Sequence, residues 1–150
     1  MTITEAIARI RIAQQDLVAN AANDCLLIAS QVKALVAFRI QSRGYSFEEK
    51  PFSPYSKRHK KKRENEGYQT GYVDFTMTGK LWNNVQPYVI ENTPESTLVE
   101  ITALNQEDQV KLQGAVKKRG NILELSESEL SLLVQLNLQR VQKYLLKVAE

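Results

Sequence analysis

The chain has 150 residues, with 20 Lys and Arg against 17 Asp and Glu, a formal net charge of +3 and 43% apolar residues. This composition excludes a wholly disordered, collagen-like or disulfide-rich protein and fits one globular domain with an aliphatic core. Because the chain has one cysteine, Cys25, and one histidine, His59, an internal disulfide and a Cys/His zinc site are excluded. Polar residues interrupt every apolar run before the roughly 18 residues of a membrane span, so we expect a soluble protein without a membrane partner. The amino terminus lacks the pattern of a secretory signal.

A long helix is predicted over residues 1–43. From residue 4 to residue 40 there is no Pro or Gly, and apolar side chains recur at spacings of three, four and seven. A straight helix of about 36 residues, the length of the stretch without Pro or Gly, measures roughly 50 Å, more than a compact domain of this size needs. It either breaks near residues 22–24 or protrudes and packs against a neighbouring molecule.

The basic charge is concentrated in one segment. Residues 57–63 contain six of the 20 Lys and Arg side chains, which leaves 14 basic against 17 acidic residues, a net charge of −3, in the rest of the chain. Pro and Gly residues flank the run and predict a long loop over residues 44–71. Six adjacent cations repel one another, so we expect this loop to lie in solvent or to meet an acidic partner.

The rest of the chain predicts a small sheet and a closing helix. Three segments have the pattern of strands: residues 72–77, 88–91 and 96–102. Between the first two, residues 80–85 form a helical turn whose Trp82 is more often a core residue than an interface anchor. Residues 104–115 are mildly helical, and residues 117–120 form a second, exposed loop.

The last helix has the clearest signal. Ser126 followed by Glu129 makes a capping box at its start, and an apolar stripe continues almost to Glu150. The predicted fold is a single α+β domain with a long N-terminal helix, a long basic loop, a small antiparallel sheet of short strands within residues 72–125, and a C-terminal helix, residues 126–150, packed on the sheet.

The sequence has no constellation that indicates catalysis. No nucleophile with a base, paired carboxylate site, metal cluster or glycine-rich phosphate loop is visible, so we expect a protein that is not an enzyme and uses no cofactor or metal. His59 is expected to be part of a solvated loop and Cys25 a buried apolar residue. Asp74 and Glu91 are expected to face solvent.

Three roles for the basic loop stay open: binding nucleic acid, docking on an acidic protein surface, or acting as a solvated tether. Aromatic side chains nearby could stack on bases or anchor the ends of the loop. The candidate interaction residues, including a smaller basic turn near residue 118, are Phe52, Tyr55, Lys57, Arg58, His59, Lys60, Lys61, Lys62, Arg63, Tyr68, Lys117, Lys118 and Arg119.

Two regions resemble the tail-completion and virion-morphogenesis proteins of bacteriophages. Residues 51–60, PFSPYSKRHK, are similar to a Pro-Tyr-Ser turn followed by a Lys/Arg-rich stretch, and residues 67–85 are similar to a short strand that ends in Thr-Gly before a Leu-rich turn. Residues 113–130 resemble the pattern of a Gly, an Arg, an apolar pair, a Ser cap and a final helix. The chain departs from the family at residues 120–123, GNIL, where Pro and Phe are usual.

The resemblance implies a structural role without catalysis. Such proteins have an α+β fold and form hexameric or dodecameric rings in the neck of the virion, between the portal of the head and the tail, with genome DNA passing through the channel. The expected partners are therefore further copies of this chain, adjacent portal, adaptor or tail-tube proteins, and the DNA. The expected location is the virion, after synthesis in the bacterial cytoplasm. The alternative from a different class is a small nucleic-acid-binding protein that acts through residues 57–63.

Overall fold

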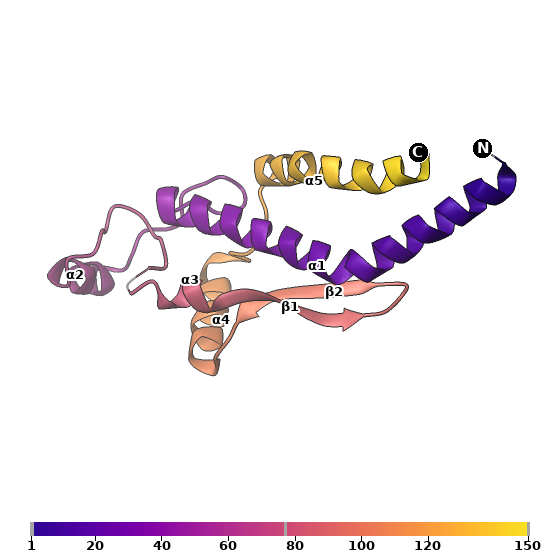
Figure 1. Cartoon of the computed structure of the whole chain (residues 1–150). Helices are drawn as coiled ribbons and strands as arrows, with labels where there is room; N and C mark the ends of the chain where they lie inside the picture. The colour runs from indigo at the N-terminus through magenta and orange to yellow at the C-terminus, as the bar shows by residue number, and fades with distance from the viewer. Residues whose placement is uncertain (1, 77, 150) are drawn as a thin grey trace.

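The computed structural model describes residues 2–76 and 78–149 and has the predicted α+β fold. Figure 1 shows a long first helix, a two-stranded hairpin along one side of it and a closing helix on the other side. The elements in chain order are α1 (Ile3–Arg43), α2 (Lys57–Asn65), α3 (Lys80–Asn84), β1 (Val85–Asn92), β2 (Thr97–Ala103), α4 (Gln106–Arg119) and α5 (Glu127–Ala149).

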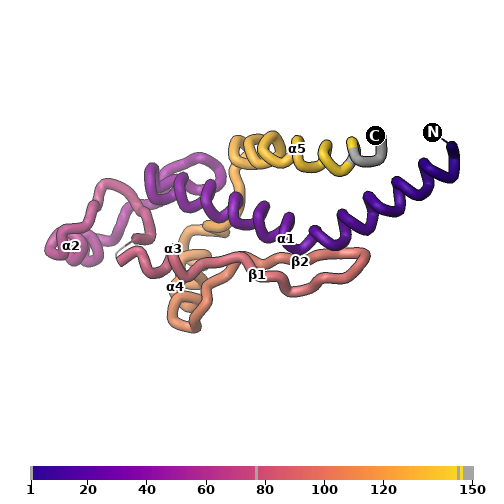
Figure 2. Tube along the Cα trace, in the orientation of Figure 1, coloured from indigo at the N-terminus to yellow at the C-terminus, as the bar shows by residue number. Residues whose placement is uncertain are grey.

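Helix α1 is continuous over 41 residues and does not break into two helices near residues 22–24. A capping box starts it: the Thr2 hydroxyl accepts from the Glu5 amide and the Glu5 carboxylate accepts from the Thr2 amide at 2.6 Å. It ends at Gly44, whose φ of 67° needs a residue without a Cβ, and whose amide donates to the Ile40 carbonyl. The helix bends about midway, and its amino-terminal half extends beyond the hairpin and α5 (Figure 2).

The sheet is a two-stranded antiparallel hairpin. Val85 pairs with Ala103 at the base and Asn92 with Thr97 at the tip, with a register shift next to Val89. The predicted strands at residues 88–91 and 96–102 are confirmed.

The strand predicted over residues 72–77 is wrong for residues 72–76, which are irregular, while residue 77 lies outside the described residues. Side chains take the backbone hydrogen bonds that a neighbouring strand would have made: the Asp74 amide donates to the Tyr55 hydroxyl, Trp82 donates to the Asp74 carbonyl and Arg63 donates to the Thr76 carbonyl. The backbone of this segment is therefore held in place without a strand partner.

The main core lies between α1 and the base of the hairpin. Val36 and Ile40 of α1 are fully buried there against Val85 of β1, and Trp82 of α3 joins them, as expected for a core tryptophan. The remaining buried members of this cluster come from β2, α4 and the segment before α5: Ala103, Leu112 and Ile122. The hairpin base and helices α3 and α4 are thus fixed to the carboxyl-terminal half of α1.

Helix α5 packs against α1 and not on the sheet, which corrects the predicted packing. The hairpin lies along the opposite side of α1 from α5 (Figure 1). Arg39 of α1 forms a buried ion pair with Glu129 of α5 and donates to the Glu124 carbonyl at 2.9 Å, and burial lowers the pKa of its guanidinium. The predicted capping box is confirmed, because the Glu129 carboxylate also accepts from the Ser126 amide at 2.8 Å while the Ser126 hydroxyl accepts from the Glu129 amide.

Helix α4 includes the basic turn that the sequence placed in an exposed loop. Lys117, Lys118 and Arg119 form its last turn, where cations are favoured by the partial negative charge of the helix end, and Gly120 follows at a φ of 81°. The start of α4 is fixed to α3 through a buried carboxylate, Asp108.

The Asp108 carboxylate accepts hydrogen bonds from Asn84 of α3 at 2.6 Å, from the N-cap Asn105 at 2.9 Å and from Lys111 at 3.0 Å. These bonds, that of Asn84 first, lower the pKa of Asp108 to about 2. The ionised carboxylate is therefore part of the joint between α3 and α4.

The sequence was expected to contain no stretch that could span a membrane, and by length and composition this expectation is wrong for α1. Within α1 a stretch of 18 residues is long and apolar enough to cross a bilayer, and 11% of it is buried. The core helix of a soluble protein passes the same test but is mostly buried, whereas this stretch is mostly not, although α1 contacts both the hairpin and α5.

Candidate interaction surface

The segment expected to be a basic loop contains helix α2. Ser56 caps its start by accepting a hydrogen bond from the His59 amide. Two acidic residues after the basic run reduce the repulsion, because Lys60 lies 3.9 Å from Glu64 and Lys62 lies 3.8 Å from Glu66, one helical turn apart. The predicted loop over residues 44–71 is thus corrected to a short cationic helix between two irregular segments.

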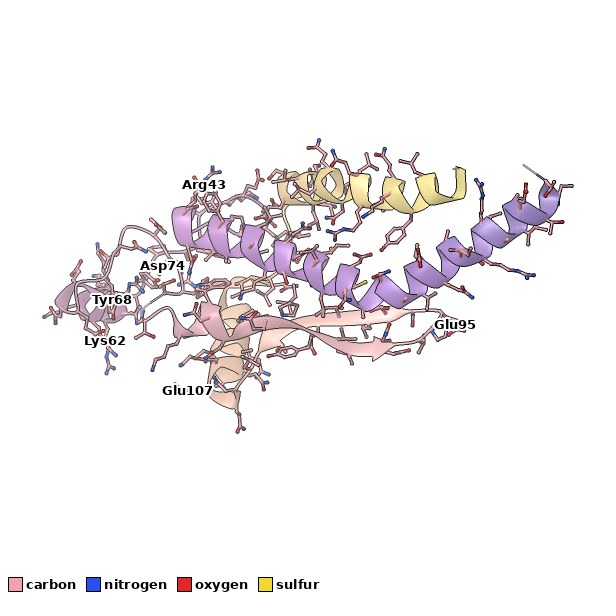
Figure 3. All side chains as sticks on the ribbon, viewed as in Figure 1. Arg43, Lys62, Tyr68, Asp74, Glu95 and Glu107 are labelled. Carbon is pink, nitrogen blue, oxygen red and sulfur yellow. The ribbon has the colours of Figure 1, made fainter. Side chains whose placement is uncertain are left out.

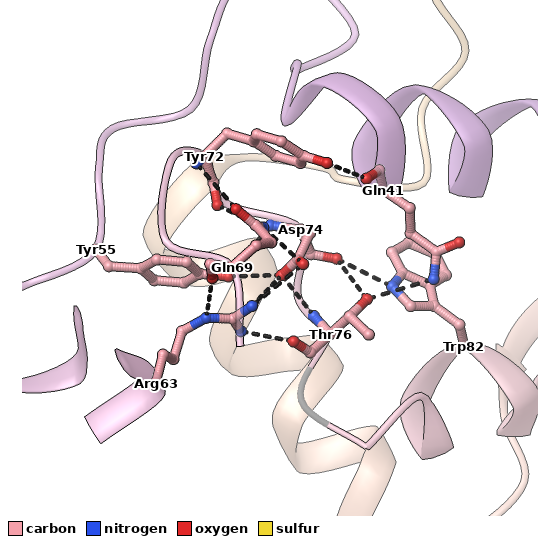
Figure 4. Close-up of polar contacts among 8 residues, drawn as sticks. All are labelled: Gln41, Tyr55, Arg63, Gln69, Tyr72, Asp74, Thr76 and Trp82. Atoms are coloured by element: carbon pink, nitrogen blue, oxygen red, sulfur yellow. Dashed lines mark hydrogen bonds and ion pairs between the residues drawn. The ribbon is translucent and has the colours of Figure 1, made fainter. Parts of the chain in front are cut away.

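Arg63 is not an interaction residue on the surface, as the sequence suggested, but the anchor of α2. Its side chain is only 1% exposed, and its guanidinium lies 3.1 and 3.2 Å from the two carboxylate oxygens of Asp74. It also donates to the carbonyls of Gln69 at 2.8 Å and Thr76 at 2.6 Å. Every guanidinium nitrogen therefore has a partner, as a buried cation requires (Figure 4).

Asp74, expected to face solvent, is buried and completes this cluster. Its carboxylate accepts from the Tyr55 hydroxyl at 2.8 Å, from the Gln69 side-chain amide at 2.7 Å and from the Thr76 amide at 2.9 Å, besides Arg63. The sequence contains no spacing that links Asp74 to Arg63, so this pair could not be found from the sequence. Glu91, the other carboxylate expected in solvent, is exposed.

The rings of Tyr55 and Tyr68 both lie close to the buried guanidinium. The Arg63 carbon Cζ is 4.7 Å from the ring centre of Tyr55 and 5.7 Å from that of Tyr68, within the range of cation–π contacts. Burial raises the pKa of the Tyr55 hydroxyl, which donates to Asp74. Both rings are thus parts of the anchor, while their outer edges stay half-exposed.

His59 is half-buried in α2 and not part of a solvated loop. Its ring packs at 4.9 Å from that of Tyr55, and burial, with the neighbouring cations of Arg63 and Lys62, lowers its pKa. The imidazole is therefore neutral at pH 7 and contributes an apolar surface.

The exposed cations of α2 are one part of the predicted site that remains available to a partner. They point outward from the end of the molecule that Figure 3 marks with Lys62. They are Lys57, Arg58, Lys60, Lys61 and Lys62.

Helices α2 and α4 face each other across a groove with a volume of about 730 Å³. We call it the basic groove and define it by the residues Tyr55, His59, Phe75, Lys111, Lys118 and Arg119. A second hollow of about 440 Å³ adjoins it, shares Tyr55, His59, Phe75 and Lys111, and is edged by Lys80. The groove combines aromatic walls with cationic edges, which suits an anionic partner with some apolar surface.

Lys118 of the basic groove and Lys80 of the adjoining hollow are exposed and, within the described part of the chain, have no ion pair. Lys111 is already paired with Glu107 at 2.7 Å.

Arg119 joins α4 to the segment before α2. Its guanidinium donates to the Ser53 carbonyl and lies 6.0 and 5.8 Å from the ring centres of Phe52 and Phe75, which pack edge-to-face with each other. Burial lowers its pKa. Phe52 and Arg119, both predicted as interaction residues, therefore hold the walls of the groove together, while Lys117 and Lys118 remain exposed.

Two helices leave apolar side chains without cover, and we call these surfaces the apolar helix faces. Many of these side chains recur at helical spacings, which predicted contacts with the core. Ile3, however, is 81% exposed and Leu136 is 53% exposed. On the amino-terminal half of α1 they are Ile3, Ile7, Ile10, Ile12, Leu17 and Val18. On α5 they are Leu130, Leu132, Val134, Leu136, Leu138, Val141 and Leu146. Exposed apolar surface of this extent is typical of a protein that buries it against a partner.

No group of three or more His, Cys, Asp or Glu residues that could hold a metal ion is present in the part of the chain that the structure describes. Cys25 is half-buried in α1 and not fully buried as expected. The buried carboxylates of Asp74 and Asp108 each accept at least three hydrogen bonds, so both are fixed in place by their neighbours.

No family model, curated protein or solved structure matches the chain. The family resemblance seen in the sequence therefore stays a prediction.

Proposed function

We propose that the chain is a structural subunit that assembles with copies of itself into a ring in the neck of a tailed bacteriophage virion. The apolar helix faces carry this proposal, because a chain of 150 residues with a complete core of its own still leaves two helices with uncovered Leu, Ile and Val side chains. Closed oligomers cover such surfaces on each subunit with the surfaces of its neighbours.

The resemblance of residues 51–60, 67–85 and 113–130 to tail-completion proteins supports the location in the neck. The resemblance also implies a role without catalysis, cofactor or metal, and no metal-binding group of His, Cys, Asp or Glu is present among the described residues. In the ring, the exposed cations of α2 would face the DNA path or an acidic surface of a portal, adaptor or tail-tube protein, and repetition around the ring would multiply weak contacts.

Disrupting the gene for this chain tests the proposal. Cells should then release DNA-filled heads and free tails that are not joined, and supplying the intact chain should restore joined particles. Joined, infectious particles in the absence of the chain would contradict the proposal.

The exposed cations of α2 favour one alternative, a nucleic-acid-binding protein that acts alone in the cytoplasm. If the five of them contact phosphates, the logarithm of the affinity for duplex DNA should fall with the logarithm of salt concentration with a slope of about −4. Tight binding by the purified chain with such a slope favours this alternative, whereas a neck subunit binds free DNA weakly.

A further inference from the structure

The charge of the molecule is divided between its two ends. Residues 81–110 contain no Lys, Arg or His, and Glu91, Glu95 and Glu100 of the hairpin are all exposed. In Figure 3, Glu95 lies at the hairpin tip, beside the amino-terminal half of α1, which extends beyond it, and Lys62 of α2 lies at the opposite end of the molecule. The hairpin tip is thus an acidic end, and the region around the basic groove is a cationic end.

Apolar surface accompanies the charge at both ends. Beside Glu91 at the hairpin tip, Ile90 is 57% and Leu98 is 53% exposed. In the basic groove the apolar surface comes from the rings of Tyr55 and Phe75. Each end therefore has what the other would need: carboxylates with aliphatic side chains on one, and cations around aromatic walls on the other.

The hairpin tip is also ordered by its own hydrogen bonds. The Thr93 amide donates to the Ser96 carbonyl at 2.8 Å, and the Ser96 amide donates to the Thr93 hydroxyl at 3.0 Å. A turn that already has a fixed conformation loses little conformational entropy when it docks.

We propose that the hairpin tip of one copy of this chain docks in the basic groove of the next copy. Lys80 and Lys118, which have no ion pair among the described residues, would meet Glu91 and Glu95 of the neighbour. The groove volume of about 730 Å³ lies in the range of established binding pockets. Because the two surfaces differ and lie far apart on the chain's fold, the contact is head-to-tail, the type that forms a ring where the rotation between copies closes. This inference rests on the self-association in the proposed function.

Zero-length carbodiimide cross-linking tests the contact directly. An equal mixture of ¹⁴N- and ¹⁵N-labelled full-length chain is treated at the highest concentration that stays in solution, and cross-linked peptides are identified by mass spectrometry. Mixed-isotope peptides that join Glu91 or Glu95 to Lys80 or Lys118 are expected, since only contacts between chains mix the labels. Cross-links between chains that involve none of these lysines, or no cross-links between chains, would overturn the proposal.

Charge reversal gives a second readout. The variants E91K/E95K and K80E/K118E should each associate at least about tenfold more weakly in sedimentation experiments, because two attractive pairs become repulsive. An equimolar mixture of the two variants should recover the association, since every hairpin again meets a groove of opposite charge. The control K57E/K61E reverses two exposed cations of α2 that do not line the groove, and should change the association by less than about threefold because distant exposed charges are screened.

If the groove binds something other than the hairpin tip, the charge-reversal variants should behave differently. Reversal variants that associate as the unchanged chain does would overturn hairpin docking but leave the proposed function in place, with assembly through the apolar helix faces. Loss of oligonucleotide binding in K80E/K118E with unchanged self-association would also overturn it and assign the groove to nucleic acid. Failure of the proposed function is seen separately, as joined particles that form without the chain.

Discussion

Replacing Arg63 by Met should destabilise the protein far more than replacing its neighbour Lys62. Arg63 is 1% and Asp74 9% exposed in their side chains, and removal of one partner leaves the other charge buried and unpaired. Such a change typically costs about 3–5 kcal/mol. Asp74 would keep three donors, from Tyr55, Gln69 and Thr76, so we expect a loss of about 3 kcal/mol in the free energy of unfolding.

Urea unfolding followed by fluorescence measures this loss. The single tryptophan, Trp82, donates to the Asp74 carbonyl at 3.2 Å, so its emission reports on the cluster itself. Circular dichroism on the same samples checks that the helices unfold in the same transition. The variant K62M removes an exposed cation whose nearest carboxylate, on Glu66, is 3.8 Å away, and should lose less than about 0.5 kcal/mol.

The double variant R63M/D74N separates the charge from the packing. Neutralising Asp74 in the absence of Arg63 should recover about 1–2 kcal/mol, because an uncharged amide is less costly to bury than an unpaired carboxylate. If R63M unfolds at the same urea concentration as K62M, or if D74N makes R63M still less stable, Arg63 does not act as the buried anchor of α2.

Three further outcomes are expected. In thermal unfolding, Gly44→Ala should lower the free energy of unfolding by at least about 2 kcal/mol, because a Cβ there would lie 2.8 Å from the Cβ of Tyr72 at a φ of 67°. The control Gly67→Ala places a Cβ with nothing within 4 Å and should lower it by about 1 kcal/mol, so equal losses would contradict the close approach at Gly44. Asp108 has a folded pKa of about 2 against an ordinary 3.8, so its stabilising effect is complete above the ordinary value and disappears as the pH falls through the folded value. The melting temperature of Asp108→Asn should accordingly vary less with pH below about 4, and parallel pH curves for the two proteins would refute this. Leu136→Ser should leave the melting temperature within the scatter of surface variants but weaken self-association by about tenfold, and unchanged association would show that this part of α5 lies outside any interface.

The helices with strong local signals could be predicted from the sequence. The absence of Pro and Gly together with the apolar repeat predicted α1, and Ser126 with Glu129 fixed the start of α5, because capping depends on residues a few positions apart. The two hairpin strands followed from alternation and the polar turn between them. Each of these signals is local, so neighbouring residues sufficed.

Several of the errors concern contacts between parts of the chain that no local pattern links. The basic run was taken as a loop, since six cations repel each other, but buried contacts of Arg63 with Asp74, eleven residues away, tie the helix to the rest of the fold. The same contacts replace the strand that was predicted around Asp74. Helix α5 packs on α1 because Glu129 pairs with Arg39, a partner ninety residues away that no periodicity reveals.

The structure also changes which residues of the candidate site can meet a partner. Arg63, Arg119 and Phe52 hold α2 and α4 in place, which leaves the outward cations of α2 with Lys117 and Lys118 of α4 as the exposed part. The apolar helix faces of α1 and α5 add a second exposed surface, because some of the apolar side chains that the sequence assigned to the core are exposed. Charge and apolar contact between subunits are therefore the two forces on which the proposed assembly depends.

Electron cryomicroscopy of the tailed particles released by cells that make this chain tests the proposed function most directly. The account predicts a ring of density between the portal vertex and the tail into which α1, the hairpin and α5 fit, with neighbouring copies covering the apolar helix faces. Particles whose neck density is fully explained by other proteins, with this chain absent from the purified virions, would contradict it.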